Sequence, residues 1–383
     1  MHNFEYYNPV KIIFGKGTIA RLKDELPADS KMLMIYGGGS IKRNGIYEQV
    51  MEALKGFDYG EFAGIEPNPH YETCMKAVER IRHEKFTFLL AVGGGSVIDA
   101  AKFISAAALY AGDAWDFFVR QVPVGKTLPV GVVLTLPATA SEMNERSIIT
   151  RISTNQKLGL HSKALYPKFS ILDPETSYSL PAVQIANGVV DSFIHVAEQY
   201  LTYPVNALVQ DYYAEALMRI FIDEGQRVLQ YPDNYNVRAN LMWASANALN
   251  GLIGVGVPQD WSSHRMGYGL TTDYGMDHAQ TLAIIFPAVM RYMRNRKEEK
   301  LLRMGSVLYG INEGSVEEKV DKTIRETELF FRYMGLKTRL SECGLGKEAI
   351  ESVARPFELT GWQLGEHGNI GAKEVREIMQ LCL

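Results

Sequence analysis

The sequence predicts an α/β domain over residues 1–180, followed by an all-helical domain over residues 181–383. Short apolar runs alternate with helical periodicity in the first half of the chain, which is typical of a parallel sheet covered by helices. From about Leu180 onward, strand patterns disappear and helical patterns continue to the end. A length of 383 residues also favours two domains, because domains average roughly 150 residues.

The expected elements follow from these patterns. In the first half, four apolar runs end in Gly, Pro or Asp and predict buried strands at 31–36, 86–92, 131–137 and 169–174. Helical periodicity covers 46–57 and 71–84 between them. In the second half, helices are expected over 183–201, 207–229, 237–254 and 323–336. Pro181 is well placed to start the first helix of the second domain.

Composition excludes several classes of protein. A net charge of −4 gives no reason to expect a nucleic-acid partner or a polybasic membrane contact. No run approaches the ~20 apolar residues of a membrane span, and the N-terminus lacks a signal-peptide pattern. Cys74, Cys343 and Cys382 are too few and too widely spaced for a disulfide framework or a zinc knot. We therefore expect a cytoplasmic protein.

A glycine turn follows the strand predicted at 86–92. Gly93, Gly94 and Gly95 allow a sharp turn and close approach of a ligand, and Ser96 adds a hydroxyl. The free N–H groups at the start of the next helix would favour a pyrophosphate. A plain strand-to-helix turn is the alternative. The pattern also differs from the GxGxxG dinucleotide fingerprint.

A second glycine turn ends the strand predicted at 31–36. It offers Gly37, Gly38, Gly39 and Ser40, then Lys42 and Arg43, and no acidic residue. Backbone donors, a hydroxyl and positive charge suit a ribose 2′-phosphate, which favours NADP over NAD. The alternative is that both basic side chains are only solvated surface charges.

The segment VVDSFIHVAEQY places Asp191 and His195 four residues apart, on one face of a predicted helix. His264 and His278 lie on or beside later apolar helices. One carboxylate and three imidazoles suit a divalent ion such as Fe²⁺ or Zn²⁺. Each residue taken alone is more often a hydrogen-bonded core residue. Spacing does not show that the four converge.

Several stretches together carry a resemblance, including YGGGSIKRNG, FLLAVGGGSVIDAAKF, LTLPATASEMN, NGVVDSFIHVAEQY, WSSHRMG and MDHAQTLAIIFP. The chain resembles the iron-dependent (type III) alcohol dehydrogenases over nearly its whole length, and most of all the branch of butanol dehydrogenases and NADP-dependent aldehyde reductases. The resemblance implies a nucleotide-binding α/β domain before a helical domain, the architecture also found in dehydroquinate synthase. It further implies a homodimer at least.

The resemblance also assigns site residues. Asp191, His195, His264 and His278 would coordinate one divalent ion, iron or zinc. Gly94, Gly95 and Ser96 would hold the pyrophosphate, and Gly37, Gly38, Gly39 and Ser40 would meet the adenosine ribose or its phosphate. The remaining positions implied to bind the cofactor are Asn68, Asp99, Thr135, Thr139, Asn144 and Lys157.

One position departs from the family pattern. Relatives commonly carry a histidine four residues after the third metal ligand, whereas this chain has Tyr268 in HRMGYG. A tyrosine, with a reference pKa near 10, is a poorer proton donor and acceptor at neutral pH than a histidine, with a pKa of about 6.5. Tyr268 either passes a proton, leaves that task to solvent, or only lines the pocket.

The function implied by the resemblance is hydride transfer between NADPH and a metal-bound aldehyde of short or medium aliphatic chain. Two other classes stay open. A lyase or synthase of the dehydroquinate synthase type would need a basic cluster for its substrate, but only Arg265 lies near the ligands in sequence. A nucleotide- and metal-binding sensor is supported only by Tyr268. Consumption of NADPH with butanal separates all three classes.

Overall fold

The computed structural model describes residues 1–383, which form two compact units. One unit contains residues 7–180 and 233–246, and the other contains residues 1–6, 181–232 and 247–383. The first is an α/β structure and the second is helical, as the sequence predicts. No helix is long and apolar enough to cross a bilayer.

The α/β unit is built on one parallel sheet of six strands. Its strands, in spatial order, are β1 (Lys11–Phe14), β8 (Phe169–Leu172), β5 (Val130–Leu136), β4 (Phe88–Gly94), β2 (Lys31–Tyr36) and β3 (Asp58–Phe62). Every neighbouring pair is parallel. A parallel sheet needs helical crossovers between its strands, and these cover both of its faces.

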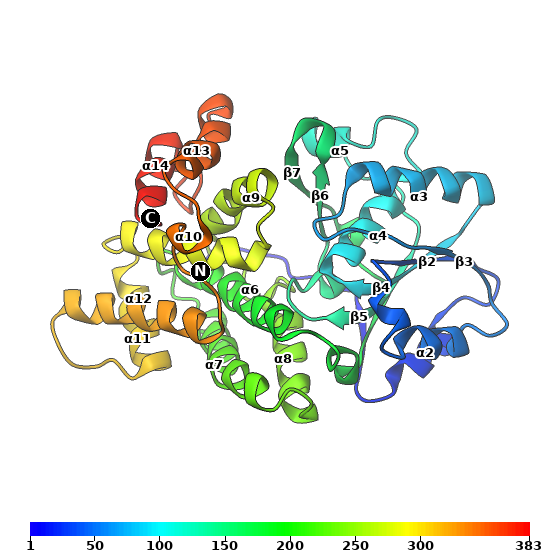
Figure 1. Cartoon of the computed structure of the whole chain (residues 1–383), viewed down its shortest axis with the longest axis horizontal. Helices are drawn as coiled ribbons and strands as arrows, with labels where there is room; N and C mark the ends of the chain where they lie inside the picture. The colour runs from blue at the N-terminus through cyan, green and yellow to red at the C-terminus, as the bar shows by residue number, and fades with distance from the viewer. The chain divides into compact units, whose positions relative to one another are not determined.

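Side chains of each central strand alternate between two cores. In β2, Leu33 and Ile35 face the core that contains α3 (Tyr71–Glu84) and α4 (Gly95–Ala107). Met32 and Met34 face the core that contains α2 (Ile46–Ala53) and α1 (Leu22–Glu25). Figure 1 shows α3 and α4 on one side of the sheet and α2 on the other. The continuous apolar runs of the sequence reflect this burial on both faces.

The four strands predicted from the sequence are present, with ends shifted by up to two residues. Two edge strands, β1 and β3, and a separate antiparallel hairpin of β6 (Arg146–Arg151) and β7 (Gln156–His161) were not predicted. The strand β3 has the sequence DYGEF and is only partly buried, so it lacks the apolar run that identifies a central strand. A short helix, α5 (Asp116–Val119), follows α4.

The order of the strands defines a topological switch point between β2 and β4. The chain leaves β2 toward β3, on one side, and leaves β4 toward β5, on the other. The two strands pair directly, with Tyr36 opposite Val92 at their carboxyl ends. Ligands of open α/β sheets bind outside the carboxyl ends of the strands at such a point. Both glycine turns found in the sequence follow these two strands.

The helical unit packs helices against one another without a sheet. Its helices are α6 (Ala182–Tyr200), α7 (Leu208–Gln230), α9 (Ser262–Tyr274), α10 (His278–Tyr292), α11 (Glu298–Tyr309), α12 (Val316–Tyr333), α13 (Glu348–Thr360) and α14 (Ala372–Gln380). One apolar core joins α9, α10, α13 and α14. The rings of Phe193, Phe286, Phe330 and Phe331 connect α6, α10 and α12. These contacts fix the three helices that carry the predicted metal ligands.

The helix α8 (Tyr235–Ala248) packs within the α/β unit, although it comes late in the chain. Met242 and Ala246 are buried in the core that contains α3 and α4, and Trp243 meets Phe14 of β1. Residues 233–246 therefore group with the α/β unit, and residues 1–6 group with the helical unit. The division at residue 180 into two domains stays a prediction.

Candidate metal and nucleotide sites

The helix α6 presents Asp191 and His195 on one buried face. The two residues are one turn apart, and Asp191 Oδ1 lies 3.5 Å from His195 Nδ1. Both side chains are only 6% exposed. A buried carboxylate beside a buried imidazole is costly unless both have strong partners, so this face calls for a specific role.

The helix α9 brings a second imidazole to the same carboxylate. His264, in the first turn of α9, places Nε2 3.8 Å from Asp191 Oδ1. Asp191, His195 and His264 can each offer a ligand atom so that all three atoms lie within 4.8 Å of one another. Trp261, just before α9, packs its ring against both imidazoles. Residues distant in sequence thus form one cluster.

The first residue of α10 is the fourth predicted ligand. His278 Nε2 lies 3.9 Å from Asp191 Oδ1, and its side chain is 22% exposed, more than the other three. His278 belongs to the same cluster through Asp191, although it lies outside the tightest group of three. One carboxylate with three imidazoles is a donor set suited to Fe²⁺ or Zn²⁺. The four residues therefore fit a divalent ion.

A second carboxylate on α6 lies behind His264. Glu198 follows Asp191 by seven residues and contacts Nδ1 of His264 through Oε2. Its Oε1 accepts a hydrogen bond of 2.7 Å from the backbone N–H of Ser263, and Oε2 accepts a longer one of 3.4 Å from His264 N–H. Burial and the nearby Asp260 raise the pKa of Glu198, whereas the two N–H groups oppose that rise. The sequence analysis did not select Glu198.

The start of α9 is also held by a buried ionic cluster. Asp260 accepts hydrogen bonds from the backbone and hydroxyl of Ser262, and its own N–H donates to the carbonyl of Glu198. Lys297 lies 2.6 Å from Asp260 and 2.9 Å from Glu366, with all three side chains nearly inaccessible. Lys297 thus lies between the carboxyl groups of Asp260 and Glu366. These contacts hold the segment that precedes His264.

Tyr268 lies one turn after His264 on α9. Its ring centroid is 6.1 Å from that of His278, and the Arg265 guanidinium lies 5.7 Å from the Tyr268 ring. The side chain is partly accessible. The structure therefore places a residue with a hydroxyl group beside the cluster.

The turn after β4 is closed to side chains. A Cβ atom on Gly93 would lie 2.6 Å from Val97 Cγ2, and one on Gly95 would lie 2.3 Å from Thr139 Oγ1. On Gly94 it would lie 3.0 Å from Leu136 Cβ. Gly93 has no room for a Cβ because Val97 of α4 lies against it, and Gly95 has none because Thr139, in the loop after β5, packs on it. The N–H groups in the first turn of α4 have no acceptor within that helix, and this end of a helix favours an anion.

Three polar side chains gather beside this turn. Lys157, from β7, donates a hydrogen bond of 2.7 Å from Nζ to Asn68 Oδ1. The backbone N–H of Asn68 donates to Ser96 Oγ at 3.3 Å. Asn68 has a φ of 54°, a left-handed conformation that asparagine tolerates better than most residues. The hairpin, which the sequence analysis did not predict, thus places a buried lysine near the glycine turn after β4.

The other residues expected to bind the nucleotide lie in or beside the loop after β5. Asp99 accepts hydrogen bonds from Ser141 Oγ and from Ile148 N–H, at 2.5 and 3.0 Å. Asn144 Oδ1 accepts one from the fully buried Lys102 at 3.1 Å. Burial lowers the pKa of Lys102 to about 8, although Asp99 opposes this change. Asp99 and Asn144 therefore hold the loop, and Thr139 packs on Gly95; Thr135 lies near the end of β5.

The turn after β2 has a partly exposed basic residue with its own partners. Lys42 Nζ lies 3.4 Å from Glu61 Oε2 and 4.5 Å from the ring centroid of Tyr47. Glu61, from β3, also accepts hydrogen bonds from Tyr47 and Tyr36 at 2.6 and 2.8 Å. The bond to Glu61 raises the pKa of Tyr47 to about 12. The turn itself contains no acidic residue. The neighbouring strand β3 supplies Glu61, whose carboxylate accepts from Tyr36, Lys42 and Tyr47.

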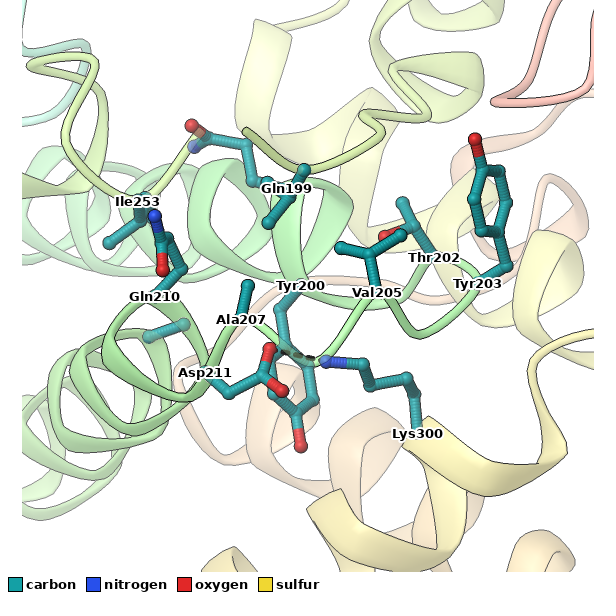
Figure 2. A pocket seen from close by; sticks show the side chains of 12 residues that line it. Gln199, Tyr200, Thr202, Tyr203, Val205, Ala207, Gln210, Asp211, Ile253 and Lys300 are labelled. Atoms are coloured by element: carbon teal, nitrogen blue, oxygen red, sulfur yellow. Dashed lines mark hydrogen bonds and ion pairs between the residues drawn. The ribbon is translucent and has the colours of Figure 1, made fainter. Parts of the chain in front are cut away.

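A small cavity in the helical unit lies apart from the four predicted metal ligands, none of which lines it. Figure 2 shows that Lys300 reaches across toward Asp211 and pairs with it beside Tyr200. The Lys300 ammonium also lies 4.5 Å from the ring centroid of Tyr200. Lys300 and Asp211 therefore satisfy one another, whereas Gln210 Oε1, also in the lining, has no hydrogen-bond partner.

Comparisons with known families identify the class of protein. The model described as iron-containing alcohol dehydrogenase matches residues 9–174. The model for the C-terminal region of the Fe-containing alcohol dehydrogenase family matches residues 185–378. The two matches together cover most of the chain. The chain belongs to the iron-containing alcohol dehydrogenase family.

Individual relatives extend over the whole chain. It is 48% identical over 384 residues to the NADPH-dependent aldehyde reductase YqhD of Escherichia coli, covering 99% of each chain. The crystal structure of YqhD matches with a TM-score of 0.98 at 47% identity, covering 100% of this chain and 99% of the other. The NADP-dependent alcohol dehydrogenase 3 of Entamoeba histolytica is 41% identical over 388 residues, covering 99% and 98% of the chains. An NADH-dependent butanol dehydrogenase A structure from Thermotoga maritima has a TM-score of 0.95 at 37% identity, covering 100% and 99%.

Proposed function

We propose that this protein is a metal-dependent alcohol dehydrogenase that reduces aldehydes with NADPH. Membership of the iron-containing family and 48% identity to an NADPH-dependent aldehyde reductase support this function. The observation that carries the proposal is the convergence of Asp191 with three imidazoles from three helices. NADPH supplies the hydride, and the divalent ion supplies a Lewis acid that polarises a carbonyl group.

The residues of the helical unit have separate tasks in this proposal. Asp191, His195, His264 and His278 hold the ion, iron or zinc. The burial of Asp191, His195 and His264 supports this role, because a low-dielectric surrounding strengthens charge stabilisation. The greater exposure of His278 marks the side from which a substrate enters. The ring of Tyr268 lies beside His278 and limits the space around that side.

The residues of the α/β unit bind the nucleotide. Gly94, Gly95 and Ser96 cradle the pyrophosphate, and Asn68 and Lys157 stand beside them. Gly37, Gly38, Gly39 and Ser40 meet the ribose and its 2′-phosphate. Their position at the switch point of the sheet supports this arrangement. Thr135, Thr139, Asp99 and Asn144 shape the adjoining loop. Fixing the pyrophosphate orients the nicotinamide for transfer.

Preference for NADPH over NADH comes from the turn after β2. Lys42 and Arg43 supply positive charge, and Ser40 supplies a hydroxyl for a 2′-phosphate. Glu61, the one acid that the fold brings there, is already bonded to two tyrosines and Lys42. It is therefore poorly placed to accept from a free 2′-hydroxyl of NADH, which supports the preference.

Tyr268 holds or passes the proton that the product alcohol requires. Its position one turn from His264 and beside His278 supports that role. A tyrosine hydroxyl can relay a proton through water without being ionised itself. We further propose aliphatic aldehydes of short and medium length as substrates, a homodimeric assembly and a cytoplasmic location. We also propose that the domains divide near residue 180.

The test is a spectrophotometric assay of NADPH consumption on a series of linear aldehydes, repeated with NADH. We expect faster turnover with NADPH, loss of turnover in metal-stripped protein and recovery on adding Fe²⁺ or Zn²⁺. The variant His264→Ala, which removes one proposed metal ligand, should stay folded but lose both the bound metal and the aldehyde reductase activity. Absence of NADPH consumption with every aldehyde, or full activity in metal-stripped His264→Ala, contradicts the proposed function.

A further inference from the structure

The metal-facing side of α6 carries three functional positions. Asp191, His195 and Glu198 are spaced by four and three residues, which places them on one helix face. The first two face the predicted metal position. Glu198 is 2% exposed and instead lies against the opposite side of His264, at Nδ1. The imidazole of His264 therefore lies between two carboxylates of the same helix.

The two ring nitrogens of His264 have different surroundings. Nε2 lies 3.8 Å from Asp191 Oδ1, on the side of the other imidazoles. Nδ1 lies against Glu198 Oε2. A histidine binds a metal through a nitrogen that carries no proton, so the proton of a neutral ligand must be on the other nitrogen. A carboxylate next to Nδ1 accepts a hydrogen bond from the Nδ1–H group. It therefore favours the tautomer in which Nε2 carries no proton and can bind the metal.

Glu198 also fixes the backbone that carries His264. The N–H groups of Ser263 and His264 belong to the first turn of α9 and have no acceptor within that helix. Trp261, at the N-cap position, makes no side-chain cap and has a φ of 63°. The carboxylate of Glu198 takes the place of that cap, at the positive end of the helix dipole. One side chain thus sets both the position and the tautomer of His264.

We propose that Glu198 is a positioning residue that prepares His264 to bind the metal. This inference rests on the proposed metal site. Glu198 accepts three donors, namely two backbone N–H groups and the imidazole Nδ1–H, and touches neither substrate nor nucleotide. Such partners behind metal-binding histidines alter metal affinity by roughly 10- to 100-fold when they are replaced.

Glu198→Gln separates this role from simple packing. Glutamine fills the same space, but its NH₂ group only donates. If the NH₂ faces His264, it favours the tautomer with the proton on Nε2, which blocks the metal. If it faces Ser263, it meets an N–H donor. Glu198→Ala leaves a cavity, but water can then hydrogen-bond to Nδ1 of His264 and either tautomer can form. If Glu198 only fills space, Glu198→Gln should weaken metal binding less than Glu198→Ala does. If Glu198 positions His264, Glu198→Gln should weaken metal binding at least as much.

The experiment measures the dissociation constant of Zn²⁺ by chelator competition in the full chain, together with the visible absorption of Co²⁺-loaded protein. For Glu198→Gln we expect weaker Zn²⁺ binding by about tenfold or more and a changed Co²⁺ spectrum. Glu198→Ala should weaken binding no more than Glu198→Gln does. Glu215→Gln is the matched control, because Glu215 is a buried carboxylate of α7 that pairs with Arg303 and Tyr200. It should lower thermal stability and leave Zn²⁺ affinity unchanged.

Two failures are distinguishable. If the unmodified protein binds Zn²⁺ and reduces aldehydes, but folded Glu198→Gln binds Zn²⁺ equally well, only the positioning role is overturned. If the unmodified protein binds no divalent ion, the metal site itself is overturned, and with it the proposed function.

Discussion

Asp191 and His195 lie one turn apart on α6 and bring a carboxylate oxygen within 3.5 Å of an imidazole nitrogen, in a buried position. The same oxygen lies 3.8 Å from His264 and 3.9 Å from His278. Asp191 is thus the central residue of the cluster. Each of the three imidazoles has a ring nitrogen within 3.9 Å of this one oxygen.

The first prediction concerns this centre. Asp191→Asn keeps the size of the side chain but removes its charge, so we expect loss of bound metal and of aldehyde reduction. His161→Ala is a suitable control. His161 is mostly exposed on β7, and it pairs with Glu145 within the α/β unit, which does not contain the metal cluster. Metal analysis of both purified variants checks the prediction. Retention of a full equivalent of metal by Asp191→Asn is the contrary outcome.

The second prediction concerns the turn after β4. Gly95→Ala forces a Cβ to within 2.3 Å of Thr139 Oγ1, so either the turn or the loop after β5 must move. Overpacking of this kind typically lowers folding stability by about 1–3 kcal/mol. We also expect a higher KM for NADPH, because a displaced turn no longer presents the N–H groups of α4 to the pyrophosphate, and a loss of about 1.4 kcal/mol in binding corresponds to a tenfold rise. Gly125→Ala, where an added Cβ meets nothing within 4 Å, should leave KM unchanged. Equal KM values in both variants would refute the assignment of this turn.

A third prediction concerns the buried lysine of the hairpin. Lys157→Met keeps the length of the side chain but removes the charge and the 2.7 Å bond to Asn68. In the proposed site the Lys157 ammonium also faces the phosphates of NADPH. A hydrogen bond between charged groups contributes about 1.5–3 kcal/mol, so losing it should weaken NADPH binding by roughly tenfold or more. Zn²⁺ affinity should not change. Quenching of protein fluorescence by NADPH measures the dissociation constant. Unchanged NADPH affinity removes Lys157 from the nucleotide site.

The fourth prediction concerns pH and a buried acid. Glu142 is 1% exposed, and its Oε1 has no hydrogen-bond partner. Burial raises the pKa of Glu142 to about 7, although Lys102 opposes that rise. Its folded pKa lies above the unfolded value of 4.5. The folded protein therefore holds more protons between these two values, and stability falls as the pH rises from about 4.5 to about 7.

Glu142→Gln should remove that loss of stability. At about pH 8 the variant should be more stable than the unmodified protein by up to about 3 kcal/mol, and at about pH 5 the gain should be far smaller. The control is Glu328→Gln. Burial alone would raise the pKa of Glu328, but hydrogen bonds from Arg291 and Arg339 outweigh it and lower the pKa. Neither guanidinium changes its charge over this pH range, so the replacement of Glu328 shifts stability by a nearly constant amount. Denaturant unfolding at the two pH values measures the free energy of unfolding of both variants and of the unmodified protein. If Glu142→Gln changes this free energy equally at about pH 5 and about pH 8, the result argues against a buried charge on Glu142.

The central strands and the long helices could be predicted from the sequence because their apolar periodicity directly reflects burial. The edge strand β3 could not, because its half-exposed sequence DYGEF has no such pattern. The placement of α8 could not either. Periodicity shows that Met242 and Ala246 are on an apolar face, but not that they pack with the α/β unit.

The candidate site shows the same limit. The spacing of Asp191 and His195 predicts one helix face, and the resemblance to a family supplies His264 and His278. Glu198 follows the same spacing, three residues after His195, and could have been found by extending that face by one turn. Its partner is 66 residues away in the chain, and no local pattern in the sequence connects the two. Likewise, Glu61 joins Lys42 and Tyr36 only because β3 lies beside β2.

The most direct test of the central claim is the rate of NADPH oxidation by an aldehyde as a function of bound metal. Protein stripped by a chelator should lose activity, and stepwise addition of Fe²⁺ or Zn²⁺ should restore it in proportion to occupancy, up to one ion per chain. Reduction at the full rate in protein shown to contain no metal would contradict the account.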